Sequence, residues 1–275
     1  MRFFRPRGLL DMASARSPLA QAVAMYRAGR HADAEKEARA VAASRSRRRN
    51  DKWAPVALGV AAIAAGAQGR HTEALTLHDE AVTLFATILG EAHPQTLKAR
   101  SDRAQQLASL GRHAECEAEC AEVVSAAARS TEPEAAHVAL AARNGQVFAL
   151  TELGRHQEAE ALAREALDAA QGMPERFHLV LRLNLARSLN GQARHDAALA
   201  EAEHARRLHR GLPAAEQRAE AGAVDLAVAT ALLGLGRGDE ARVRAVVAHD
   251  ACRAVLGPDH RRTVEARDLV GRIGA

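Results

Sequence analysis

The sequence contains few aromatic residues, few cysteines and few lysines. Aromatic residues make up 3% of the 275 positions, which disfavours β-sandwiches, because their strands depend on Val, Ile, Tyr and Phe. Alanine supplies much of the 48% hydrophobic content and favours closely packed helices. The three cysteines have no regular spacing, so we expect no disulfide framework and a reducing, cytoplasmic environment. The net charge of +4 comes almost entirely from arginine and permits an acidic partner without requiring one.

The short motifs of common catalytic sites are missing from the sequence. No Lys follows a Gly, which excludes the phosphate-binding loop Gly-x-x-x-x-Gly-Lys, and neither Gly-x-Ser-x-Gly nor His-Glu-x-x-His occurs. The many carboxylates fall where solvated helix faces and first helical turns are expected. We therefore expect no enzyme, no catalytic residue, no cofactor and no metal.

No segment has the pattern of a secretion signal or a membrane span. Residues 1–16 form a basic N-terminal segment without the apolar stretch of a signal peptide, and either Met1 or Met12 could be the true start. The uncharged run at residues 53–69 is short and rich in Ala and Gly, which makes it a poor transmembrane helix. These features predict a soluble, cytoplasmic protein with no membrane association.

An element of the form Gly-Arg-His followed by an acidic helix start recurs along the whole chain. Its last two copies are altered, to Ala-Arg-His and Gly-Arg-Gly. The first residue of each copy, taken as position zero of its repeat, is Gly29, Gly69, Gly111, Gly154, Ala193 or Gly236. The mean spacing is about 41 residues, and a fixed period in this range is typical of stacked supersecondary units.

Counting from position zero aligns the repeats. Positions −7 and −4 share one face of a helix that ends at the Gly, and positions +5 and +9 share one face of the helix that follows. Positions −7 and +5 hold small residues, mostly Ala, so the two helices can cross closely. Glycine suits a left-handed backbone that ends the first helix. Each repeat is therefore predicted to be a helical hairpin, and the fold to be all-α.

The aligned pattern resembles the tetratricopeptide repeat, which has Leu-Gly-x-Tyr-x-x-Ala at the same turn. The longer period is similar to the kinesin-light-chain type and its bacterial relatives, which join hairpins through Leu-Gly-x-x-His-Pro-x-Thr. Residues 89–96 match that junction, and residues 256–263 match it with Arg261 replacing Pro. The resemblance implies a right-handed superhelical solenoid over residues 17–275. Its expected hairpins cover residues 17–50, 51–92, 93–132, 133–172, 173–212 and 213–259, and a capping helix follows at 261–273, which could instead be a truncated seventh repeat.

By the same resemblance, the inner faces of the first helices line a concave groove that binds a protein or peptide. Positions −13, −9, −6 and −2, with −10 beside them, face this groove; we call them the groove face. The central repeats carry polar residues and one aromatic there, which suits an extended peptide held by amides with an apolar residue against the ring. The candidate binding residues are Lys98, Asp102, Gln105, Asn144, Phe148, Asn184 and Arg187. The paired asparagines of this repeat type are only partly present, at Asn144 and Asn184.

Other interpretations stay open. The polar groove residues could be ordinary lining without a ligand, or the array could be a signalling or transcription-linked regulator whose curvature responds to a peptide or effector. The basic cluster of Arg45 and Arg47–Arg49 could contact nucleic acid, although a solvated linker is favoured and no nucleic-acid partner is expected. Oligomeric state does not follow from the pattern.

Two groups of possible metal ligands have a structural explanation. The five histidines at position +2 belong to successive repeats about 10 Å apart, the usual spacing of packed helices, so they would not converge on one ion. Cys116 and Cys120, one turn after His113, could form half of a zinc site. They occupy the +5 and +9 positions that other repeats fill mostly with Ala, so core packing is the favoured interpretation.

Overall fold

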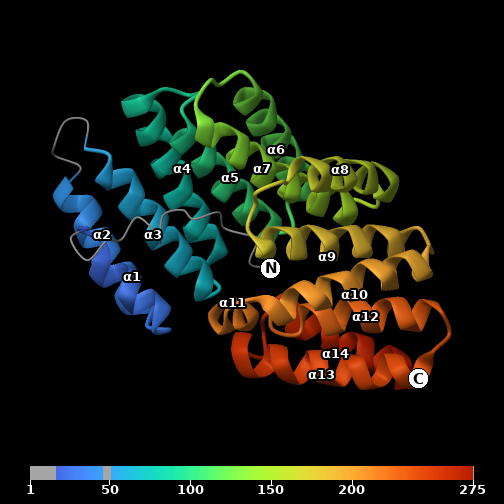
Figure 1. Ribbon diagram of the computed structural model, residues 1–275. Helices are drawn as coiled ribbons and strands as arrows, with labels where there is room; N and C mark the ends of the chain where they lie inside the picture. The colour runs from blue at the N-terminus through green and yellow to red at the C-terminus, as the bar shows by residue number, and fades with distance from the viewer. Residues whose placement is uncertain (1–16, 46–50, 275) are drawn as a thin grey trace. The chain divides into compact units, whose positions relative to one another are not determined.

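The protein is all-α in the part of the chain that the computed structural model describes, residues 17–45 and 51–274. Its described residues fall into two compact units, which meet in sequence between Gly145 and Gln146. We call them the first and the second unit. The boundary lies within α7, Pro133–Glu152. Figure 1 shows antiparallel helices stacked side by side in each unit.

The first unit contains, before α7, the helices α1 Ala20–Arg27, α2 His31–Arg45, α3 Trp53–Ala67, α4 His71–Leu89, α5 Pro94–Ser109 and α6 His113–Ala128. The second unit contains, after α7, the helices α8 His156–Ala169, α9 Glu175–Gly191, α10 His195–Gly211, α11 Ala214–Ala219, α12 Ala223–Gly234, α13 Gly238–Leu256 and α14 Arg261–Gly274. Within each unit, neighbouring helices in the chain pack on one another, as α2 does on α3 and α9 on α10. The fold class expected from the sequence is confirmed.

The six turns at position zero share one backbone geometry. The position-zero residue has a positive φ of 57–79° in every turn. The next N–H, that of an Arg, donates to the carbonyl at position −4, at 2.9–3.1 Å. This is the Schellman arrangement that ends helices. Ala193 is the non-glycine example, with φ 57°.

Small residues let the helices of a hairpin approach closely, as the alignment predicted. All six residues at position −7 and all six at position +5 are fully buried, with 0% exposure. Position +9 is equally covered, and there Cys120 is 1% exposed. A Cβ atom added to Gly145 would lie 2.9 Å from the Cys120 Sγ. Cys120 is therefore core packing, in the slot that Ala fills in four of the other five repeats.

Histidine rings lock one hairpin to the next in the second unit. A Cβ atom at Gly191 of α9 would lie 2.4 Å from the ring of His156, which begins α8. A Cβ atom at Gly234 of α12 would lie 2.3 Å from the ring of His195, which begins α10. Each ring occupies the volume of a missing side chain on the following hairpin.

Both copies of the expected junction motif have the same local structure. Gly90 and Gly257 end their helices with φ of 92° and 91°. His93 directly precedes α5 and accepts on Nδ1 a hydrogen bond from the backbone N–H of Gln95, while Thr96 Oγ1 donates to the Gly90 carbonyl. His260 and Thr263 make the same two bonds in the second copy. The exchange of Pro for Arg261 leaves this geometry intact.

The first helix of the sixth repeat is broken, which the sequence pattern did not predict. It consists of α11 and α12, separated by Gly222 with φ 68°. A Cβ atom at Gly222 would lie 2.4 Å from Cys252 Sγ and 2.5 Å from the Ala248 carbonyl oxygen. The break allows the start of α12 to approach α13 this closely.

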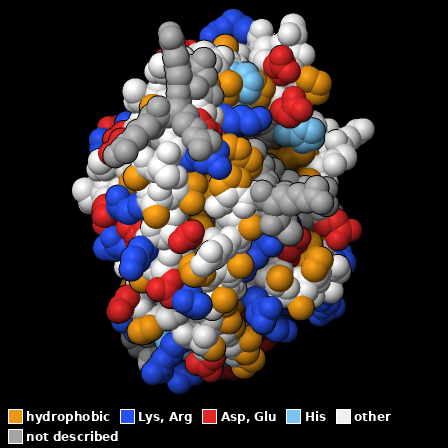
Figure 2. Space-filling view, turned by 90° about the vertical axis from the view of Figure 1, so that its left-hand side faces the viewer, with side chains coloured by type: hydrophobic (Ala, Val, Ile, Leu, Met, Phe, Trp, Pro, Cys, Tyr) orange, Lys and Arg blue, Asp and Glu red, His pale blue; other side chains and the backbone are white. Residues whose placement is uncertain are grey.

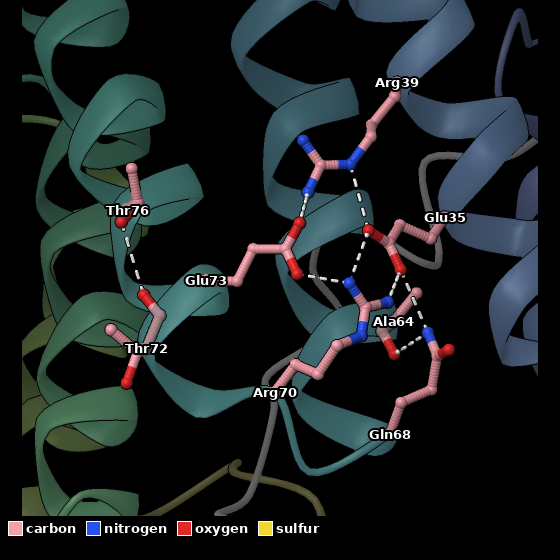
Figure 3. A network of polar contacts seen from close by, with 8 residues as sticks. All are labelled: Glu35, Arg39, Ala64, Gln68, Arg70, Thr72, Glu73 and Thr76. Atoms are coloured by element: carbon pink, nitrogen blue, oxygen red, sulfur yellow. Dashed lines mark hydrogen bonds and ion pairs between the residues drawn. The ribbon is translucent and has the colours of Figure 1, made fainter.

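A charged network links consecutive hairpins, and the described residues of each unit contain one example. In the first unit, Glu35 on α2 accepts hydrogen bonds from Arg39, Gln68 and Arg70, and both arginines also pair with Glu73 (Figure 3). In the second unit, Glu160 accepts from Arg164, Gln192 and Arg194 at 2.6–3.0 Å. In both networks the glutamate is at position +6 and the arginine on its own helix is at +10. The Gln and the other Arg lie directly before and after position zero of the next repeat.

The last helix packs on the hairpin before it. Ala266 and Leu269 of α14 are buried against Leu226 of α12 and Ala245 of α13. The expected N-terminal segment 1–16 and Arg47–Arg49 lie outside the described residues.

We predict that Ala193→Gly stabilises the protein by about 1 kcal/mol, because a non-glycine residue in the left-handed region carries a cost of this order. Gly154→Ala, at the matching turn of the preceding repeat, should destabilise by a similar amount, since its added Cβ meets no atom within 4 Å and only the backbone is strained. Urea unfolding of both variants measures the difference. An unchanged or lower free energy of unfolding in Ala193→Gly would contradict backbone strain at Ala193.

We predict that the Glu160 network stabilises the fold above about pH 4.5 and ceases to do so in acid. Burial raises the pKa of Glu160, but Gln192, Arg164 and Arg194 lower it more, so it lies below its ordinary value of 4.5. A lowered folded-state pKa contributes stability that is lost as pH falls through that folded value. Between pH 6 and pH 3, the melting temperature of wild type should therefore fall more than that of Glu160→Gln. Glu165→Gln, at an exposed carboxylate on the same helix, is the control and should follow wild type.

Candidate functional site

A cleft of about 570 Å³ lies in the second unit. Its walls come from the C-terminal end of α7 and from α9, α12 and α14, with the loop residue Gly154 and the first residue of α8 at its edge. The volume falls in the range of about 300–1,000 Å³ that is common for ligand pockets. We call this feature the cleft.

The groove face of three consecutive repeats lines much of the cleft. Glu152 is at position −2 of its repeat, Asn184 at −9 and Arg187 at −6. The groove-face residues on the wall are Glu152, Val180, Leu183, Asn184, Arg187, Gly191, Ala223, Leu226, Ala227 and Thr230. The aligned repeats therefore predicted which side of α9 and α12 would line a cavity in this unit.

Ion pairs cross the cleft from α14 to the earlier helices. Arg187 on α9 lies 2.9 Å from Glu152 on α7 and 2.7 Å from Glu265 on α14. Arg261 on α14 lies 2.8 Å from the other oxygen of Glu152. The Arg187 side chain is 27% exposed and that of Glu265 39%, so both side chains are partly exposed to solvent.

The pairing keeps these groups ionised. Burial raises the pKa of Glu152, but Arg261 and Arg187 lower it more, and the result lies below the ordinary value. Burial lowers the pKa of Arg187, yet Glu265 and Glu152 raise it above its ordinary value. A carboxylate with a lowered pKa is a poor proton donor at neutral pH. The cleft is suited to holding charged and polar groups.

Phe148 lies beneath this ion-pair chain. The ring is 1% exposed, and the guanidinium of Arg261 lies 5.0 Å from its centroid, a cation–π geometry. A ligand side chain would have to displace Arg261 to reach the ring.

The other candidate residues belong to the first unit and are not among the residues that line the cleft. Lys98 pairs with Asp102 at 2.6 Å, and Asp102 is 6% exposed. Gln105 is half-buried on the same helix, α5. Asn144, on α7, is 1% exposed. Of the seven candidates, the structure brings Asn184 and Arg187 together on the cleft wall, with Phe148 below it.

The sequence interpretation missed Arg261, Arg262 and Glu265, because the groove-face positions were not counted along the last helix. The signal was available. If Gly274 is taken as position zero of that helix, Arg261 falls at −13 and Glu265 at −9, both on the groove face. Arg262 also lines the cleft, but its guanidinium is held in the fold: it donates to the Ala221 carbonyl at 3.1 Å and pairs with the buried Glu220 at 3.4 Å.

The cysteines and histidines show no metal geometry. Cys116 and Cys120 are buried free thiols, and the Cys116 side chain together with burial raises the pKa of Cys120 well above its ordinary value. Within residues 17–45 and 51–274, no three His, Cys, Asp or Glu side chains gather as a metal site would need. Thiols with raised pKa values are poor metal ligands and poor nucleophiles.

Basic side chains do not form a single-sign patch on the face drawn in Figure 2, where Lys and Arg are interspersed with Asp and Glu. Arg45, the described member of the basic cluster, pairs with Asp51 at 3.2 Å. Among the described helices, none has the length and apolarity to cross a membrane.

The sequence matches the family model of the tetratricopeptide repeat at residues 57–95 and 227–262. Each matched segment ends in or near one of the two junction motifs. A search of curated proteins gives no match.

Several solved structures share the fold. One is a kinesin-light-chain structure from Podosopora anserina, whose TPR-like repeats are nearly identical to one another. It superposes on this chain with a TM-score of 0.57 and 21% identity, over 75% of this chain and 97% of that one. BtubC (BKLC) from P. vanneervenii gives a TM-score of 0.59 and 19% identity, over 89% and 94%. The apo form of RapI gives 0.64 and 11%, over 92% and 97%.

Tetratricopeptide folds generally mediate protein–protein interaction and are typically non-catalytic. The two matched repeats, the six equivalent turns and the shared fold make this chain a tetratricopeptide-like repeat protein.

Proposed function

We propose that the protein is a non-catalytic binding scaffold that holds a segment of a protein or peptide in the cleft. The observation that carries this proposal is the composition of the wall. Arg187, Arg261, Glu152 and Glu265 present accessible charges of both signs, and they lie on the face where a tetratricopeptide array binds its partners.

Three kinds of contact are available to such a segment. Val180, Leu183 and Leu226 offer an apolar wall for a small aliphatic side chain. Asn190 and Thr230 offer amide and hydroxyl groups for peptide backbone. The paired arginines and glutamates can exchange partners with charged side chains, which favours a ligand that carries at least one carboxylate or ammonium group.

A ligand-responsive regulator is a second candidate, favoured by the ion pairs that cross the cleft. Arg187–Glu265 and Glu152–Arg261 connect α14 to α9 and α7. A ligand carboxylate that takes Glu265's place on Arg187 would weaken the hold on α14. Faster amide hydrogen exchange in α14 on ligand binding would support this function, and unchanged exchange would leave the passive scaffold.

We predict that Arg187→Gln weakens binding of a cleft ligand at least tenfold, since a hydrogen bond to a charged group contributes about 1.5–3 kcal/mol. The probe is the tightest sequence selected from a random peptide library against the full chain, with affinity measured by calorimetry. Ala227→Met, which fills the cleft without removing an ion pair, should also weaken binding.

The matched control is Arg164→Gln, which removes a paired arginine from the outer helix α8 of the same unit. It should bind like wild type. Circular dichroism of each variant checks that the helices remain. Full affinity in both Arg187→Gln and Ala227→Met would contradict binding in the cleft.

A further inference from the structure

The outward face of α13 carries a cluster of exposed valines. Val243 is 62% exposed, Val246 40% and Val247 45%; we call these three residues the valine patch. Of the five large hydrophobic side chains that are exposed in the described residues, four lie on α13. Scattered exposed apolar residues are ordinary, but a cluster on one helical face marks an interaction surface.

The repeat register supplies an internal comparison, because the patch occupies positions +7, +10 and +11. The second helices of the other five repeats hold nothing larger than Ala among their apolar residues there. Those residues are Lys36, Arg39 and Ala40; Thr76, Asp79 and Glu80; Ala118, Ala121 and Glu122; Ala161, Arg164 and Glu165; and Ala200, Glu203 and His204. The fold therefore does not require valine at these positions.

The core contacts of α13 come from its opposite face. Ala241, Ala245, Ala248 and Cys252 are each 0% exposed, and they pack toward α12 and α14. The valine patch adds nothing to this core. α13 lies at the lower edge of the second unit in Figure 1, beside α14.

Charged residues flank the patch in a symmetric order. Asp239 and Arg242 lie seven and four residues before Val246, and Asp250 and Arg253 lie four and seven residues after it. Steps of four and seven residues stay close to one face of a helix. The sequence of signs from the N-terminal end is therefore negative, positive, valines, negative, positive.

Two copies of α13 with this order of charges attract one another when they pair in opposite directions. If two copies of α13 cross at Val246 in opposite directions, Asp239 lies opposite Arg253 of the partner subunit and Arg242 lies opposite Asp250 of the partner subunit. A parallel pairing would instead place like charges together.

We propose that the valine patch is a self-association surface, on which two copies of the chain pair their α13 helices antiparallel about a two-fold axis at Val246. The arrangement buries the valines of both copies and uses one patch on each, as a two-fold interface does. A single helix pair is small beside the interfaces of stable dimers, so the dimer is a weak, concentration-dependent one.

Sedimentation equilibrium of the full chain tests the proposal. The mass of wild type should rise from the monomer value of 29.3 kDa toward twice that value as concentration increases. Val246→Asp/Val247→Glu gives α13 the Asp and Glu that α4 carries at the same positions. Its like charges meet across the axis, so the association constant should fall at least tenfold while helicity and melting temperature stay unchanged.

Ala161→Asp, at the exposed position +7 of α8, is the matched control and should associate like wild type. A wild-type chain that stays monomeric up to its solubility limit would overturn the proposal. So would undiminished association of the Val246→Asp/Val247→Glu variant.

Charge reversal tests the antiparallel direction separately. Arg253→Glu and Asp239→Arg should each weaken association severalfold at low salt, because each places like charges opposite one another. The double variant Asp239→Arg/Arg253→Glu should recover the wild-type constant. Failure to recover, with both single variants weakened, would exclude this pairing of helices.

Discussion

The close approach of two helix backbones within each hairpin is the constraint on which the rest of the structure depends. It requires small residues at positions −7 and +5 and a left-handed residue where the chain reverses, and every repeat has a buried Ala, Val or Cys at the first two positions and a positive φ at the turn. Position +9 is small in all repeats except the second, which carries His78 there. Because the helices of a hairpin touch through alanine, few aromatic side chains are needed between them. The scarcity of aromatic residues is thus a property of the packing.

Long charged side chains form hydrogen bonds and ion pairs between consecutive hairpins. Glu35 and Glu160 each accept hydrogen bonds from an arginine on their own helix. Each also accepts from a Gln and an Arg that flank position zero of the next repeat. The same chemistry recurs at the cleft, where Arg187 lies between carboxylates of α7 and α14. There the groups are partly open to solvent, so a pairing that stabilises the fold elsewhere can also be offered to a ligand.

Much of the fold followed from the repeat register, and part of the candidate site did. Equivalent positions have equivalent surroundings, so the buried alanines, the turn glycines and the cleft positions of Asn184 and Arg187 could be predicted. Phe148 is buried under Arg261 because an arginine 113 residues away in sequence reaches it, and a local pattern carries no such information. Arg261 and Glu265 were missed because the register was not extended to Gly274, whereas the break at Gly222 depends on contacts with α13 that no repeat alignment contains.

The rings of His156 and His195 seated over Gly191 and Gly234 restrict how such an array can be rearranged. A hairpin moved to a new place would meet a neighbour whose corresponding residue has a side chain, and the ring would collide with it. The hairpins of the second unit are therefore not interchangeable. Duplication, deletion or grafting of repeats would succeed only when the moved segment contains both the histidine and the glycine on which its ring packs. The ends of that segment must then lie outside each such pair.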